Sequence, residues 1–292
     1  MKQLVQLFFC LLVILLPVMW YYHWTLYNFF HKDSQKLLRS NPSSHPPLQG
    51  YVSIPNRQKM IMHCGQCALV SSSGQMLESQ KGEEIDNAEC VLRMNNAPTV
   101  GYETDVGKRT TLRMVSHTSV PLLLRNSNYY FNQSGETVYV IWGPNRQMNQ
   151  NSNTNTYGRL AKAKQKYPSA QMYFLTEEKM AFCDKTFAIE TGKDRVKSGS
   201  YLSTGWFTMI LAMELCDDIQ IYGMVNDSYC REKHHSKVPY HYYETNKVGE
   251  CDVYNAHERA HKNAHRFITE KTVFARWAER RGHITFAYPS QS

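Results

Sequence analysis

The sequence predicts an α/β layer fold with a largely parallel sheet, held in one large domain. Short apolar runs alternate along the chain with longer amphipathic stretches, which is typical of strands joined by helices. The apolar runs are nearly continuous, as in parallel strands that are buried on both faces. The composition agrees, because 42% of the 292 residues are hydrophobic and 20% are charged. A chain of this kind buries a sizeable core and is not disordered.

The individual elements follow from the same patterns, and turn residues separate them. Helical periodicity predicts helices over residues 156–167, 206–216 and 258–280, and the Asn-rich segment 147–156 predicts an exposed loop. The predicted strands cover residues 68–72, 91–94, 111–116, 137–142, 172–175, 219–225 and 284–287.

The N-terminal segment carries the longest apolar run, from Leu4 to Tyr22, without a charged residue. A helix needs about 20 such residues to cross a bilayer, and no small-residue cleavage site follows the run. We therefore expect a tail over residues 1–3, a signal-anchor transmembrane helix over 4–22, a Pro- and Ser-rich stem over 23–60 and a luminal domain over 61–292. Basic residues after the run favour the opposite orientation, but large domains translocate largely regardless of such charges.

Two further features fit a luminal domain and a type II orientation. Asn132 and Asn226 each begin an Asn-x-Ser glycosylation triplet, and the eight cysteines suit an oxidising compartment. The net charge of +8 favours an anionic partner such as nucleic acid, an anionic membrane or a nucleotide-linked substrate. Nucleic acid is disfavoured because it is absent from the compartment that the anchor and the triplets indicate.

Two turns at predicted strand and helix ends are candidate ligand sites. Residues 67–74 form a strand that runs into a small-residue turn, where α/β sheets usually bind ligands. This turn has neither the GxGxxG nor the Walker spacing, so it does not indicate a dinucleotide or ATP site. Residues 201–205 precede a helix, so the Ser203 and Thr204 hydroxyls and the first N–H groups could face a phosphate or carboxylate. An ordinary strand-to-helix turn and simple helix capping are the alternatives.

Two histidines near the C-terminus are candidate acid–base groups. His241 is followed by Glu244 and His265 by Glu270, and the pair could supply a general base and a cationic donor. A lone histidine is more often structural, so the spacing alone does not decide between these interpretations.

Taken together, four segments resemble the sialylmotifs of animal sialyltransferases, in the family's order and over roughly residues 60–290. Residues 67–126 resemble the long motif and include Arg93-Met-Asn-Asn-Ala-Pro98, and residues 203–225 resemble the short motif. Residues 241–244 resemble the third motif, and His265-x4-Glu270 resembles the very short one. Residues 116–124 and 205–208 resemble the alpha-N-acetylgalactosaminide alpha-2,6-sialyltransferases, in particular short-stemmed members that act on already sialylated chains.

The resemblance implies an activity and a fold. Members transfer sialic acid from cytidine monophosphate-sialic acid (CMP-sialic acid) to the 6-hydroxyl of GalNAc in sialylated or unsialylated Gal-GalNAc, on glycoproteins or glycolipids, with inversion. It also implies a Rossmann-like GT-A-variant domain in the Golgi membrane. No cofactor is expected, and the sequence agrees, since it contains no Asp-x-Asp pair to hold a metal ion. A catalytically inactive luminal glycan-binding protein of the same fold is the alternative.

The resemblance also implies roles for individual residues. His265 matches the family's base, and His241 matches the group that assists the departing phosphate. Glu270 is expected to be structural or to orient His265. The implied donor-binding residues are Ser72, where many relatives carry Asn, and Asn95, Tyr201, Ser203, Thr204 and Gly205.

The cysteines allow more than one interpretation. The pair Cys64-x2-Cys67 could indicate zinc or a thiol oxidoreductase, but no second ligand pair stands at zinc spacing. The resemblance implies a disulfide between Cys67 and Cys216, and a bridge between Cys230 and Cys251 is plausible. Partners for Cys64, Cys90 and Cys183 are not assigned.

Overall fold

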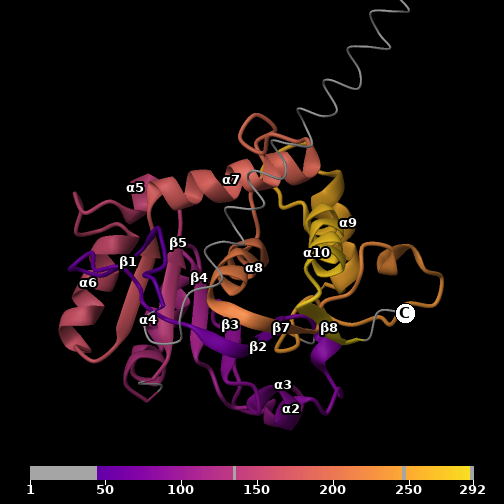
Figure 1. Cartoon of the computed structure of the whole chain (residues 1–292), viewed down its shortest axis with the longest axis horizontal. Coiled ribbons are helices and arrows are strands. Elements are labelled where there is room, and N and C mark those ends of the chain that lie inside the picture. Colours follow the sequence, from indigo (N-terminus) through magenta and orange to yellow (C-terminus); the bar gives the residue numbers. More distant parts are fainter. Residues whose placement is uncertain (1–44, 134–135, 245–247, 290–292) are drawn as a thin grey trace, which may run out of the picture. The chain divides into compact units, whose positions relative to one another are not determined.

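The computed structural model describes residues 45–133, 136–244 and 248–289 (Figure 1). Within the compact unit that begins at Pro47, eight strands form one sheet in the order β1-β6-β5-β4-β3-β2-β7-β8. All neighbouring pairs are parallel except β1 and β6. The strands are Tyr51–Ser53 (β1), Cys64–Val70 (β2), Cys90–Met94 (β3), Leu112–Ser116 (β4), Val138–Trp142 (β5), Gln171–Leu175 (β6), Cys216–Tyr222 (β7) and Ile284–Tyr288 (β8).

The prediction of an α/β domain with a largely parallel sheet is therefore confirmed. Each of the seven predicted strands overlaps one of the strands β2 to β8. From β2 the chain steps outward to β6 and then returns to place β7 and β8 on the other side of β2. The strand order thus reverses between β2 and β7, which is where open α/β sheets bind their ligands.

Strand β1 lies inside the segment that the sequence assigned to the stem. Tyr51 pairs with Leu175 and Val52 with Phe174 of β6, and Tyr51 is fully buried. The folded unit therefore begins before residue 61, and residues 47–60 belong to it. A strand of three residues is too short to produce a readable alternation of apolar and polar side chains.

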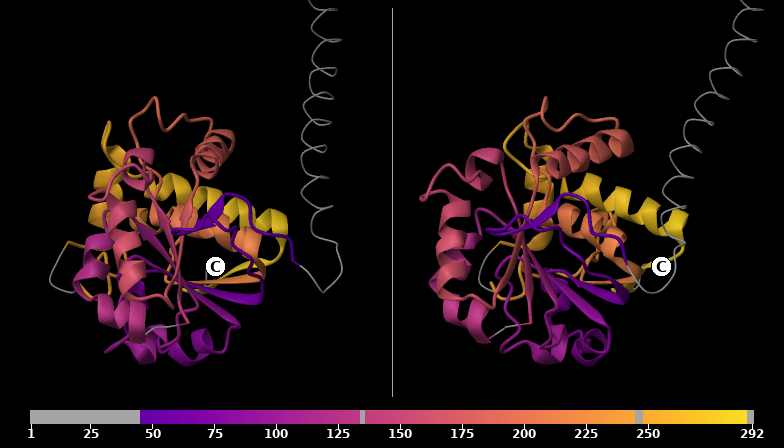
Figure 2. Two further views of the ribbon diagram at one scale, coloured as in Figure 1. Left: turned by 90° about the vertical axis from the view of Figure 1, so that its left-hand side faces the viewer. Right: turned by 60° about the vertical axis from the view of Figure 1, so that its left-hand side comes forward.

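Helices cover both faces of the sheet, as Figures 1 and 2 show. Alternate residues of each strand join separate clusters; on β2, Cys67 and Leu69 pack with α8 and α10, whereas Ala68 and Val70 pack on the opposite face. This arrangement explains the continuous apolar runs. The helices are Gly82–Asp86 (α2), Glu103–Val106 (α3), Val120–Arg125 (α4), Asn145–Met148 (α5), Thr156–Lys166 (α6), Glu177–Thr191 (α7), Thr204–Leu215 (α8), Glu250–Arg259 (α9) and Phe267–Arg281 (α10).

The predicted helices over residues 156–167 and 206–216 are confirmed as α6 and α8, but the single helix over 258–280 is wrong. The structure divides it into α9, which starts at residue 250, and α10, which starts at residue 267. Ala260 ends α9 in an extended conformation, and Asn263 has a positive φ of 57°. The connecting residues are alanine and polar residues, which are also common in helices, so the pattern of apolar and polar residues in the sequence does not reveal the break.

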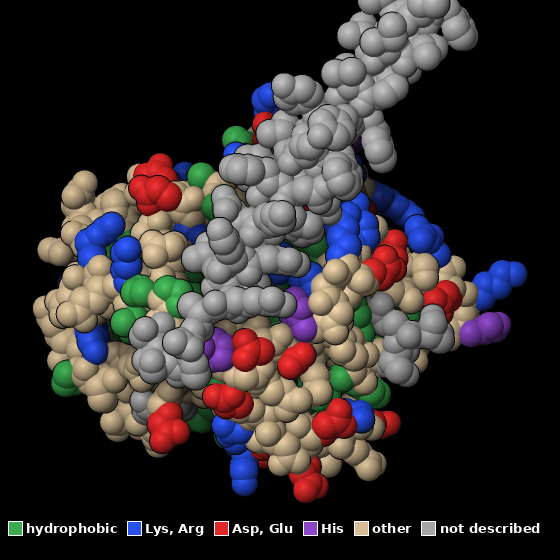
Figure 3. Space-filling view, viewed as in Figure 1, with side chains coloured by type: hydrophobic (Ala, Val, Ile, Leu, Met, Phe, Trp, Pro, Cys, Tyr) green, Lys and Arg blue, Asp and Glu red, His purple; other side chains and the backbone are tan. Residues whose placement is uncertain are grey.

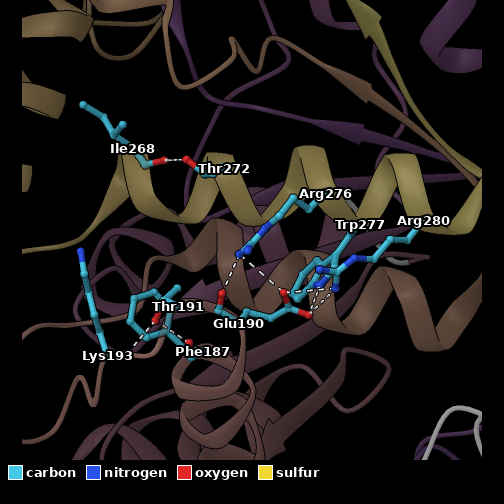
Figure 4. A network of polar contacts seen from close by, with 9 residues as sticks. All are labelled: Phe187, Glu190, Thr191, Lys193, Ile268, Thr272, Arg276, Trp277 and Arg280. Carbon is cyan, nitrogen blue, oxygen red and sulfur yellow. Dashed lines mark hydrogen bonds and ion pairs between the residues drawn. The ribbon is translucent and has the colours of Figure 1, made fainter. Parts of the chain in front are cut away.

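Helix α7, which the sequence did not reveal, is tied to α10 through Glu190 (Figure 4). The backbone carbonyl of Glu190 accepts a hydrogen bond from Arg276 at 2.6 Å. The Glu190 carboxylate accepts from Trp277 Nε1 at 2.9 Å and from Arg280 at 3.3 Å. Phe187 of the same helix packs edge-to-face on Trp206 of α8. These contacts make α7 part of the layer that covers α8.

The described residues form three disulfides. The implied bridge Cys67–Cys216 and the plausible bridge Cys230–Cys251 are both confirmed. Cys64 pairs with Cys90, so β2 is joined to β3 on one side and to β7 on the other. Cys183 is a free buried thiol whose pKa burial raises to about 12, and the disulfides of Cys64 and Cys67 leave no dithiol for an oxidoreductase.

The predicted membrane anchor over residues 4–22 lies outside the described residues. Among the helices that the structure does describe, none has both the length and the apolar character needed to cross a bilayer.

Removing the bridge at the sheet's centre should cost more stability than removing the peripheral one. Cys67 and Cys216 are 149 residues apart, whereas Cys230 and Cys251 are 21 apart, and closing a longer loop restricts the unfolded chain more. We expect Cys67→Ala/Cys216→Ala to lose about 4–5 kcal/mol and Cys230→Ala/Cys251→Ala about 3 kcal/mol. Guanidinium unfolding under non-reducing conditions measures both. Equal losses would contradict this reasoning.

Candidate active site

A cavity of about 600 Å³ lies at the carboxyl ends of the central strands. Its walls include Ser72 after β2, Asn95 after β3, His117 after β4 and Trp142 at the end of β5. The N-terminus of α8 and the segment between α9 and α10 complete it. All eight residues predicted for catalysis or donor binding line this one cavity: Ser72, Asn95, Tyr201, Ser203, Thr204, Gly205, His241 and His265.

Asn95 is held in a fixed orientation at the end of β3. Its φ of 48° is a left-handed conformation that asparagine tolerates better than most residues. The side-chain oxygen accepts from the Ser116 amide at 3.0 Å and from the Thr204 hydroxyl at 3.5 Å. Because the oxygen is engaged, the amide nitrogen is the group that can donate to a ligand.

Ser203 caps helix α8, so the alternative of helix capping is also correct. Its hydroxyl accepts from the Trp206 amide at 3.1 Å and donates to Glu270, which also accepts from the Ser203 amide at 2.9 Å. Of the two roles expected for Glu270, a structural one or the orientation of His265, its contacts support the structural one, since both of its oxygens are bonded to Ser203. Glu270 is therefore structural, and it anchors α10 to the first turn of α8.

The protonation state of Glu270 determines what Ser203 can donate. Burial raises the pKa of Glu270 to about 8, so near neutral pH the carboxyl group largely keeps its proton. A protonated Glu270 can donate to the Ser203 oxygen, and the hydroxyl hydrogen of Ser203 is then available to a ligand.

Thr204 and Gly205 form the first turn of α8 beside Asn95. The Thr204 hydroxyl accepts from Trp142 Nε1 at 3.3 Å, and Trp142 stacks on Phe207 with ring centroids 4.4 Å apart. A Cβ atom at Gly205 would stand 3.2 Å from the Ser203 hydroxyl oxygen. A side chain there would crowd the capping group, so glycine keeps the helix N-terminus open.

His265 lies in the break between α9 and α10 and is partly buried. Its Nδ1 is 3.1 Å from the Tyr201 carbonyl oxygen, which can only accept, so Nδ1 carries the hydrogen and Nε2 keeps its lone pair. Burial lowers the pKa of His265, and the neighbouring His257 lowers it further. His265 is thus a neutral imidazole at physiological pH with a free basic nitrogen.

His257, which the sequence analysis missed, supports this ring. Its Nδ1 accepts from the His265 backbone amide at 3.1 Å, and the two imidazoles stack with centroids 5.5 Å apart and planes 9° apart. Burial and Arg266 lower its pKa. Only the break between the two helices brings His257 back onto His265, so its spacing in the sequence gave no signal.

His241 shares an aromatic wall with His265. Its Nδ1 is 2.9 Å from Glu244, and its ring stacks on Tyr243 at 5.0 Å. Tyr240 lies 4.3 Å from the His241 ring and 6.0 Å from Phe267, which in turn lies 4.9 Å from His265. Histidine side chains also reach the surface between acidic and basic groups in Figure 3.

Lys271 is a second residue that sequence reasoning did not identify. It is 8% exposed and lines the cavity, and burial lowers its pKa to about 8. Its ammonium lies 4.7 Å from the Tyr254 ring centroid, and within the described residues it has no hydrogen-bond partner. Neutral pH leaves it mostly charged, so it is a cation available to an anionic ligand.

The remaining predicted positions lie outside the cavity. Asn132 is exposed, and its side-chain nitrogen donates to Asn128 at 3.1 Å. The Asn226 oxygen accepts from the backbone amides of Ser228 and Tyr229 in a turn. Glycosylation at both positions stays a prediction. No group of three or more His, Cys, Asp or Glu side chains suited to a metal ion occurs in the described part of the chain.

Known proteins are similar to this chain over most of its length. The profile of glycosyltransferase family 29 (sialyltransferase) matches residues 15–280. A human alpha-N-acetyl-neuraminyl-2,3-beta-galactosyl-1,3-N-acetyl-galactosaminide alpha-2,6-sialyltransferase is 57% identical over 254 residues, which cover 86% of this chain and 84% of the relative. The rat alpha-N-acetylgalactosaminide alpha-2,6-sialyltransferase 3 is 51% identical over 268 residues, which cover 91% of this chain and 87% of the relative. A crystal structure of a mammalian sialyltransferase is 22% identical in sequence, with a TM-score of 0.49, and the match covers 78% of this chain and 70% of that one.

The Ser203–Glu270 contact should stabilise the protein more than an ordinary cap. We expect Ser203→Ala to lose about 2–4 kcal/mol, because it removes a cap and deprives a buried carboxyl group of its hydroxyl partner. Thr176→Ala, which removes the cap of α7, should lose only about 1 kcal/mol. Thermal or denaturant unfolding compares the two variants, and equal losses would count against the role given to Glu270.

Proposed function

Because the chain belongs to glycosyltransferase family 29, the sialyltransferases, we propose that it transfers sialic acid from CMP-sialic acid to the 6-hydroxyl of GalNAc in Gal-GalNAc glycans of glycoproteins or glycolipids. One observation carries the proposal: the fixed Asn95 amide, the open N-terminus of α8 and both histidines line the same cavity. The name of the human relative, 57% identical, specifies an acceptor whose galactose is already sialylated. We take the sialylated form as the preferred acceptor.

His265 is the general base of this reaction. Its Nε2 lone pair takes the proton from the GalNAc 6-hydroxyl as that oxygen attacks the anomeric carbon of the donor sugar. The Tyr201 carbonyl holds the required tautomer, and burial keeps the ring neutral at physiological pH. A single displacement of this kind inverts the anomeric carbon.

His241 and Lys271 act on the leaving group. Cytidine monophosphate departs with a growing charge on its phosphate, which a protonated His241 and the Lys271 ammonium stabilise. Glu244 orients the His241 ring through Nδ1, so Nε2 is the nitrogen directed to the phosphate. Asn95, Ser72 and the first turn of α8 bind the rest of the donor, with the free N–H groups of that turn suited to an anion.

The reaction proceeds without a metal ion or other cofactor. The sequence has no Asp-x-Asp pair, and a monophosphate leaving group carries less charge than the diphosphates that such pairs hold through Mg²⁺ or Mn²⁺. Two cationic side chains and a helix N-terminus supply the stabilisation instead.

The domain is a Rossmann-like GT-A variant, and the protein is a single-pass type II protein of the Golgi membrane. The reversal of strand order beside the cavity supports the first assignment. The apolar run over residues 4–22, the two glycosylation triplets and the three disulfides support the second.

The full-length protein should transfer labelled sialic acid from CMP-sialic acid to Gal-GalNAc acceptors, on a glycopeptide or on a glycolipid. Transfer should be greater to acceptors with a sialylated galactose, and excess EDTA should not reduce it. Linkage analysis of the product should show sialic acid on the GalNAc 6-hydroxyl. Donor binding without any transfer would instead favour the inactive glycan-binding protein, and a loss restored by Mn²⁺ would refute the metal-free reaction.

The two histidines should fail in different ways. His265→Ala should cut turnover by about 10²–10⁴ while leaving cytidine monophosphate binding nearly intact, because a base acts on the acceptor. His241→Ala should lower the nucleotide affinity as well as the rate. In the wild type, kcat/KM should rise with pH through an apparent pKa below about 6.5, since His265 must lose its proton and burial lowers its pKa.

Calorimetry with cytidine monophosphate and single-turnover rates distinguish these variants, and His261→Ala is the control. His261 is exposed on the segment that carries His265 but does not line the cavity. Loss of nucleotide binding in His265→Ala together with normal binding and rate in His241→Ala would reverse the two assignments.

A further inference from the structure

The cavity contains more positive charge than the donor needs near the reacting carbon. Its charged lining residues are Arg146, Arg195, Glu270 and Lys271, and Glu270 largely keeps its proton near neutral pH. Arg195 is paired with Asp184 through two hydrogen bonds of 2.5–2.6 Å. Among the Lys and Arg side chains of the cavity, Arg146 and Lys271 are therefore the two whose charge is available to ligands.

These two cations belong to different walls. Lys271 lies in α10, whose preceding segment carries His265, whereas Arg146 lies in α5, after β5. Figure 1 draws α5 and α10 well apart, with α8 between them. The guanidinium of the exposed Arg146 makes no hydrogen bond or ion pair with another described residue, and its charge acts on His117. Burial and Arg146 lower the pKa of His117, so that ring is neutral and does not add charge.

The anionic groups of the donor can pair with the cation on only one of these two walls. In CMP-sialic acid the phosphate and the carboxylate are attached to the same anomeric carbon, the carbon that the acceptor attacks. Both groups must therefore lie near His265, His241 and Lys271. Arg146 is left without a donor anion to bind.

A sialylated acceptor brings a third anion. In sialyl-Gal-GalNAc the sialic acid carboxylate is separated from the attacking GalNAc by a galactose, so it lies away from the reacting carbon. An adjoining cavity of about 530 Å³ shares Pro144, Met180 and Arg195 with the first and gives such a glycan room. Glu177, Glu178 and Asp184 line that second cavity together with Arg57 and Arg195. Its lining therefore carries a net negative charge, which disfavours an anion there. The favourable place for the carboxylate is the junction, beside Arg146.

We propose that Arg146 binds the carboxylate of the sialic acid already present on the acceptor and so makes the enzyme select sialylated chains. The planar guanidinium pairs with a carboxylate through two parallel hydrogen bonds, and the Arg195–Asp184 pair beside it keeps the junction polar. The inference rests on the proposed function, because it assigns one charge of the proposed acceptor to one residue of the cavity.

The test compares three acceptors: the sialyl-α2,3-Gal-β1,3-GalNAc trisaccharide as the free acid, the same trisaccharide with its carboxylate methyl-esterified, and Gal-β1,3-GalNAc. The full-length wild type should show a KM for the ester about tenfold higher than for the acid, since a hydrogen-bonded charge is worth about 1.5 kcal/mol. In Arg146→Gln the ratio of the two KM values should fall to about one. Arg146→Lys should give an intermediate ratio, because lysine keeps the charge but loses the paired geometry.

Arg125→Gln is the matched control, since Arg125 is exposed but does not line the cavity, and its ratio should remain about tenfold. The inference is overturned if the wild type has equal KM values for the acid and the ester, or if Arg146→Gln keeps the tenfold ratio. It is also overturned if Arg146→Gln raises the KM for CMP-sialic acid as much as it raises the KM for the free-acid trisaccharide. Absence of transfer to all three glycans would refute the proposed function instead. Equilibrium binding of the acid and ester to the cytidine monophosphate-loaded protein then still measures the ratio.

Discussion

The hydrogen bonds between Glu270 and Ser203 are the constraint on which the rest of the site depends. They join the first turn of α10 to the first turn of α8 through a carboxyl group that is 1% exposed. The residues just before these turns are thereby drawn together, and Tyr201 pairs with His265 in an isolated parallel bridge. The proposed base, His265, and the helix N-terminus proposed to hold the donor are therefore held in place by the same pair of hydrogen bonds. A buried carboxyl group is tolerated there because both of its oxygens are hydrogen-bonded and it keeps its proton to about pH 8.

The cavity also separates neutral from charged groups. His265, the proposed base, is surrounded by aromatic rings and another imidazole, and burial lowers its pKa. Lys271 lies nearby, and the carboxylate of Glu250 counteracts part of the effect of burial on its charge. Glu250 is itself held by Ser73, Gln75 and Tyr254 at 2.6–2.9 Å. The turn after β2 is thus hydrogen-bonded to α9, and Glu250 of α9 acts electrostatically on Lys271 of α10.

Differences between the expected and observed elements have local causes. The seven predicted strands are continuous apolar runs, and burial between two helical layers produces that pattern directly. Strand β1 was missed because it has three residues, and α7 was missed because its apolar residues do not form one clear stripe. The break between α9 and α10 was missed because polar residues are acceptable both on a helix surface and in a loop. That break is also what presents His265 to the cavity.

The sequence by itself determined the α/β class, the family resemblance, the two histidines and the residues of the two turns, because these depend on residue type and short spacing. It also led to the disulfide Cys67–Cys216 through the resemblance. Only the tertiary structure decided that Glu270 bonds Ser203, that His257 stacks on His265, and that Lys271 and Arg146 face one cavity from different walls. These are contacts between elements far apart along the chain or separated by an unpredicted break. They depend on how helices pack across the sheet, which no local pattern of residues encodes.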